Sequence, residues 1–148
     1  MATDMVTEVF RPRGLRPIHP LHAILLGFPF ALFVAGLTAD IAYASTYQIQ
    51  WSNFAAWLNA GGLLVGAFVG LWAIVEAVRF RADRPVRAWT YLAVLLVMWI
   101  VGFLNALVHA RDAWAVMPGG LWLSALAALL AFVAAWIGYS GLRRGEVI

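Results

Sequence analysis

The chain has 148 residues, of which 64% are hydrophobic and 11% are charged, and its formal net charge is +3. Ordinary soluble domains are about 45–50% apolar and about 25% charged, so this composition excludes an ordinary water-soluble domain and indicates a protein embedded in a bilayer. The absence of cysteine excludes disulfides, thiolate metal sites and covalent haem attachment.

Four apolar stretches follow one another along the chain, at about residues 21–43, 54–78, 89–109 and 121–142. Each has roughly 20 residues or more, which is enough for a helix to cross the hydrocarbon layer. The connections are short, which favours antiparallel neighbours. We therefore predict an all-α, integral membrane, up-down-up-down four-helix bundle over residues 18–142. Residues 1–17 are predicted to form a mobile cytoplasmic tail, and residues 143–148 a second cytoplasmic tail.

Positive charge is distributed unequally between the two sides of this bundle. Nine of the ten arginines precede the first stretch, separate the second from the third or follow the fourth: Arg11, Arg13, Arg16, Arg79, Arg81, Arg84, Arg87, Arg143 and Arg144. Because short basic loops stay in the cytoplasm, we predict a multi-pass protein of the bacterial inner membrane with both termini cytoplasmic. The arginines form no basic stripe of the kind that binds nucleic acid, so no nucleic-acid partner is predicted.

Small residues recur on one face of the second and fourth stretches. Gly62, Gly66 and Gly70 form a tandem G-x-x-x-G pattern, and Gly138 belongs to an alanine- and glycine-rich stripe. Such faces allow helix backbones to approach closely. We interpret them as helix packing within one chain, with a homo-oligomer interface as the alternative.

Polar side chains fall into two layers. The inner layer, near the predicted cytoplasmic face, contains His19, His22, Glu76 and Arg79. The outer layer contains Asp40, Asn105, His109 and Asp112, with Asn59 and Arg111 at the same depth. Ionisable groups within a membrane are default candidates for function. Each layer is interpreted as a polar clasp between helices or, alternatively, as a ligand site; the pattern completes no metal site.

A haem held by two histidines within one chain is disfavoured, because His22 and His109 fall at opposite ends of their spans, about a membrane thickness apart by helical rise. No cofactor follows from the sequence, although haem or quinone remains an alternative.

The first span opens with His19-Pro20-Leu21-His22 and continues with Gly27-Phe28-Pro29. This pattern, with four spans in about 150 residues, resembles an uncharacterised bacterial membrane family, the domain of unknown function twenty-two thirty-one. Ala23 and Gly27 depart from the proline and histidine typical of that family's motif. Some members stand beside Rieske or cytochrome c modules, so the resemblance implies an electron-transfer context.

Three functions are compatible with these features. The first is an accessory or scaffolding subunit of a larger respiratory or photosynthetic complex, with the bilayer and other membrane subunits as partners. The second is a redox or ligand-binding protein that uses His22 or His109 for haem, quinone or metal. The third is a small oligomeric transporter. No catalytic set is evident, so an enzyme is not predicted.

Overall fold

The computed structural model describes residues 19–79, 86–111 and 115–140. This part of the chain consists of α1 (Pro20–Thr46), α2 (Ile49–Arg79), α3 (Val86–His109) and α4 (Gly119–Ser140). All four helices are long and apolar enough to cross a membrane. The described ranges contain no strand, and the predicted all-α, four-span architecture is confirmed.

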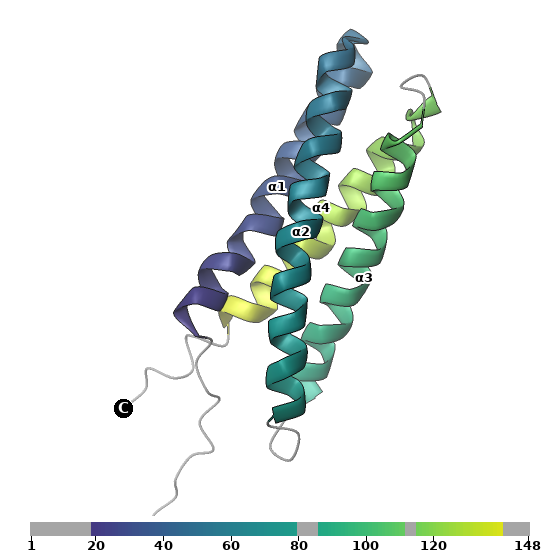
Figure 1. The fold of residues 1–148 in the computed structure, drawn as a ribbon. Coiled ribbons are helices and arrows are strands. Elements are labelled where there is room, and N and C mark those ends of the chain that lie inside the picture. The colour runs from purple at the N-terminus through teal and green to yellow at the C-terminus, as the bar shows by residue number, and fades with distance from the viewer. Residues whose placement is uncertain (1–18, 80–85, 112–114, 141–148) are drawn as a thin grey trace, which may run out of the picture.

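The helices form an antiparallel bundle in which each packs against its two neighbours in the order α1, α2, α3, α4 and back to α1 (Figure 1). The start of α1, the end of α2, the start of α3 and the end of α4 lie at one end of the bundle, which carries the inner layer. The opposite end carries the outer layer. The two predicted tails, residues 1–17 and 143–148, lie outside the described residues. The first helix begins at Pro20.

The turn between α1 and α2 is tighter than predicted, because α2 begins at Ile49 rather than near residue 54. Only Tyr47 and Gln48 separate the helices. Tyr47 adopts a left-handed conformation with φ 55°, and its N–H donates to the carbonyl of Tyr43 at 2.8 Å. An apolar stretch marks only the part of a helix that lies in hydrocarbon. The helical hydrogen bonds of α2 extend beyond that part, through polar residues, so the helix is longer than the stretch.

The Phe33 ring lies between two glycines in the bundle interior. A Cβ at Gly62 on α2 would lie 3.0 Å from this ring, and a Cβ at Gly102 on α3 would also lie 3.0 Å from it. Gly62, Gly66 and Gly138 are buried within the chain. A Cβ at Gly70, in contrast, would meet no atom within 4 Å. The G-x-x-x-G face of α2 therefore packs within the bundle at its first two glycines and is open at the third.

We expect Gly62→Ala to destabilise the bundle by about 1 kcal/mol, because a ring fixed on both sides cannot move away from the added methyl. Gly70→Ala is the matched control, and we expect it to be stabilising by about 0.5 kcal/mol, because alanine is the better helix former. Detergent-solubilised variants compared by thermal unfolding test this. Adding Phe33→Leu to Gly62→Ala should restore part of the lost stability. Equal effects of alanine at Gly62 and at Gly70 would contradict the contact between Gly62 and the Phe33 ring.

Candidate functional site

The outer layer forms a hydrogen-bonded network to which every helix contributes. Asp40 of α1, Asn59 of α2, Asn105 of α3 and Ser124 of α4 are all at most 4% exposed. The Ser124 hydroxyl donates to Asp40 Oδ2 at 2.5 Å and accepts from Asn105 Nδ2 at 2.8 Å. Asn105 Nδ2 also lies 3.5 Å from Asn59 Oδ1, and Asn59 Nδ2 donates to the Gly102 carbonyl at 3.0 Å. The network therefore ties the four helices together at one depth.

His109 closes this network into a ring. Its Nε2 lies 2.9 Å from Asp40 Oδ1, and its Nδ1 lies 3.0 Å from the Asn105 carbonyl oxygen. The carbonyl can only accept, so Nδ1 carries a proton and donates it. A second proton lies between Nε2 and Asp40, and the pair is electrically neutral whichever partner holds it. Neutrality is what a buried pair in a low-dielectric site requires.

The helix faces place these residues together for a simple reason. Asn105 and His109 are four residues apart and thus lie on one face of α3. Asp40 shares the buried face of α1 with Gly36 and Tyr43. Gly120, one turn before Ser124, leaves room for the imidazole: a Cβ there would lie 3.1 Å from His109 Cε1. The site therefore depends on both a polar and a small residue of α4.

The structure brings together three of the four predicted outer-layer residues, Asp40, Asn105 and His109. Asp112 lies outside the described residues, and Arg111 is exposed. Ser124 was not predicted as a member of this layer. Its position on the buried face of α4, one turn from the start of that helix, is the signal that could have identified it.

The chemistry available to the ring is limited by how its groups are paired. Ser124 donates to a carboxylate and not to an imidazole, so its hydroxyl is not activated as in a Ser-His-Asp triad. Both ring nitrogens of His109 already have oxygen partners. Within the described ranges, no three His, Cys, Asp or Glu side chains gather as a metal-binding group. This arrangement serves best to hold helices in register.

The inner layer is an aromatic cluster at the other end of the bundle. His22 is 2% exposed, and its Nε2 lies 3.0 Å from the Tyr91 hydroxyl. The Trp72 ring lies 5.7 Å from His22 and 5.3 Å from His19 between ring centroids. Trp72 Nε1 donates to Glu76 Oε1 at 3.0 Å. Among the described residues, His22 Nδ1 has no hydrogen-bond partner.

His22 and His109 of one chain cannot both ligate one haem in this fold. His109 contacts Asp40, which follows His22 by 18 residues on α1, or about 27 Å by helical rise. The separation expected from the sequence is thus present in the structure.

A family model described as a predicted membrane protein, DUF2231, matches residues 18–146. Neither a curated protein nor a solved structure matches the chain.

Proposed function

Because the chain belongs to the DUF2231 family of predicted membrane proteins, whose description assigns no activity, we propose a role from the geometry of this chain. The protein spans the membrane with four helices and acts as an accessory, non-catalytic subunit that scaffolds a larger membrane complex.

The closed outer-layer ring carries this proposal. Asp40, Asn105, His109 and Ser124 use their hydrogen-bonding groups on one another, which joins α1, α3 and α4 and leaves the Asp40–His109 pair engaged. Asn59 joins α2 to the same network through Asn105 and the Gly102 carbonyl. Polar groups that are paired with one another suit a scaffold better than a transporter, which needs polar groups that exchange partners. Asn105 Oδ1 is the one atom of the ring without a described partner.

The cellular setting is part of the same proposal. The arginine distribution supports cytoplasmic termini in an inner membrane. An electron-transfer complex is the setting that the family resemblance implies, since some members stand beside Rieske or cytochrome c modules. No side chain of the described ranges argues for that setting independently.

A redox or ligand-binding protein is the second candidate, and the inner layer favours it. Nδ1 of His22 is buried and has no hydrogen-bond partner among the described residues, and Trp72 and Tyr91 flank the ring. His109 is less suited to this role, because both its nitrogens are engaged.

Purification of the full chain from its native membrane in mild detergent distinguishes the two candidates. A scaffold is expected to migrate on native gels in a particle larger than a homo-oligomer, with other membrane proteins at fixed stoichiometry and no visible absorption of its own. Migration alone, as a monomer or homo-oligomer, would contradict the scaffold. A haem spectrum, bound metal or extractable quinone that is lost in His22→Ala would establish the second candidate instead.

A further inference from the structure

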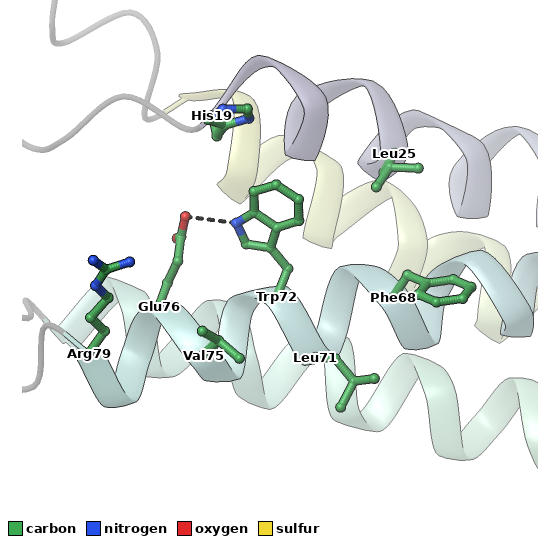
Figure 2. A pocket seen from close by; sticks show the side chains of 8 residues that line it. All are labelled: His19, Leu25, Phe68, Leu71, Trp72, Val75, Glu76 and Arg79. Atoms are coloured by element: carbon green, nitrogen blue, oxygen red, sulfur yellow. Dashed lines mark hydrogen bonds between the residues drawn. The ribbon is translucent and has the colours of Figure 1, made fainter.

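A groove of about 620 Å³ lies between α1 and α2 at the end of the bundle that carries the inner layer (Figure 2). Its volume falls in the range of small-molecule sites, roughly 300–1,000 Å³. The groove is separate from the outer-layer ring, which lies at the opposite end, and the proposed scaffolding role does not use it.

One end of the groove is polar. His19, Trp72, Glu76 and Arg79 line it, and Figure 2 shows Glu76 and Arg79 on α2 with His19 approaching from the start of α1. Glu76 and Arg79 are three residues apart and therefore share one face of the helix. The polar end thus presents a carboxylate and a guanidinium side by side.

The rest of the groove is apolar and continuous with the lipid-facing surface. Its wall consists of Leu25, Phe68, Leu71 and Val75, of which Leu71 and Val75 are 60% and 62% exposed. The distance along α2 from Phe68 to Arg79 is about 16 Å by helical rise. A ligand that enters from the bilayer would therefore lie along α2 with a hydrocarbon part below a polar head.

The charges at the polar end of the groove determine which polar head group can bind there. An ionised carboxylate only accepts hydrogen bonds, and a guanidinium only donates them. One oxygen of Glu76 accepts from Trp72, and a carboxylate accepts several hydrogen bonds at once, so a ligand can donate to it as well. A head group that complements both the carboxylate and the guanidinium carries an N–H cation next to an anion.

We propose that this groove binds an aminophospholipid, with the primary ammonium of its phosphoethanolamine head donating to Glu76 and the phosphate accepting from Arg79. A choline head offers no N–H to the carboxylate. A phosphoglycerol head brings an anion without a cation to Glu76. The carbonyl oxygens of a quinone accept only, as the carboxylate does, and so cannot pair with it.

Titration of the purified full-length protein in dodecyl maltoside tests the proposal, with native mass spectrometry and thermal unfolding as readouts. The probes are dioleoyl phosphatidylethanolamine, phosphatidylcholine and phosphatidylglycerol, which share acyl chains and differ in the head. We expect phosphatidylethanolamine to bind on the order of tenfold more tightly than phosphatidylcholine, since charge-assisted hydrogen bonds are the strong ones.

Four variants separate the head-group contacts from general lipid binding. Glu76→Gln should remove the preference, while Glu76→Asp, which keeps the carboxylate, should retain part of it and shows that the site remains folded. Arg79→Gln should weaken both lipids on the order of tenfold. Arg111→Gln removes the same charge from the opposite end of the bundle and should change neither affinity.

Equal affinity for the two lipids in the parent protein would overturn the proposal, as would a preference that survives Glu76→Gln. Recovery of quinone instead of phospholipid from the purified protein would also overturn it. Equal affinities, or a preference that survives Glu76→Gln, would not bear on whether the protein scaffolds a larger complex, so the two proposals fail separately.

Discussion

Asp40→Ala is expected to lower the free energy of unfolding by about 3 kcal/mol, the largest effect of any single substitution proposed for this bundle. The change leaves Ser124 and His109 without their shared partner in a site where Asp40 is 0% exposed. Removing one partner of a buried acid–base pair is strongly destabilising, because the remaining group is desolvated and has no hydrogen-bond partner in its place. Titration of the purified protein with a denaturing detergent, followed by circular dichroism, measures the loss.

Thr38→Ala is the matched control on the same helix. Its hydroxyl donates to the Val34 carbonyl one turn earlier and is exposed, so we expect a change below about 0.5 kcal/mol. The double variant Asp40→Ala/His109→Ala should lose at least about 1 kcal/mol less than the sum of the two single variants, because both remove the same contact. Strict additivity would show that the pair does not contribute as the geometry indicates.

Gly120→Ala is expected to destabilise the protein by about 2 kcal/mol, the second-largest effect. The new Cβ would lie 2.6 Å from Val116 Cγ1 and 3.1 Å from His109 Cε1. Val116 is fully buried and cannot move aside, so α4 must shift away from the outer-layer ring. Thermal unfolding in detergent measures the loss of stability.

Gly119→Ala provides a neighbouring control. A Cβ at Gly119 would meet no atom within 4 Å, and we expect its effect to stay below about 0.5 kcal/mol. Similar losses at the two positions would indicate a general need for glycine at this helix start and would contradict the specific contact with His109.

Much of the fold could be predicted from the sequence because the bilayer restricts the choices. Backbone polar groups within hydrocarbon must be satisfied inside each span, so an apolar stretch of sufficient length specifies a helix. Helical periodicity then indicated which residues face inward. Met98, Gly102 and Asn105 recur at helical spacing in the third span, and all three are buried.

The candidate site could be predicted only in part. Depth in the membrane follows from counting residues along a span, and this count placed Asp40, Asn105 and His109 in one layer. Counting gives no information on which helices are neighbours or how each is rotated. It therefore did not show that Ser124 donates to Asp40 or that His109 uses both nitrogens.

The number of spans, their inward faces and the two polar layers can be read from the sequence alone, because each follows from local composition and period. Whether each layer is closed or open depends on the packing of the helices. At the outer layer, Gly120 and the order of the helices bring four polar side chains into mutual contact. At the inner layer, Glu76 and Arg79 lie at the polar end of a groove between α1 and α2 that opens to lipid. Whether the polar side chains of a layer contact one another depends on the distances between helices, and these cannot be predicted from the sequence of any one span.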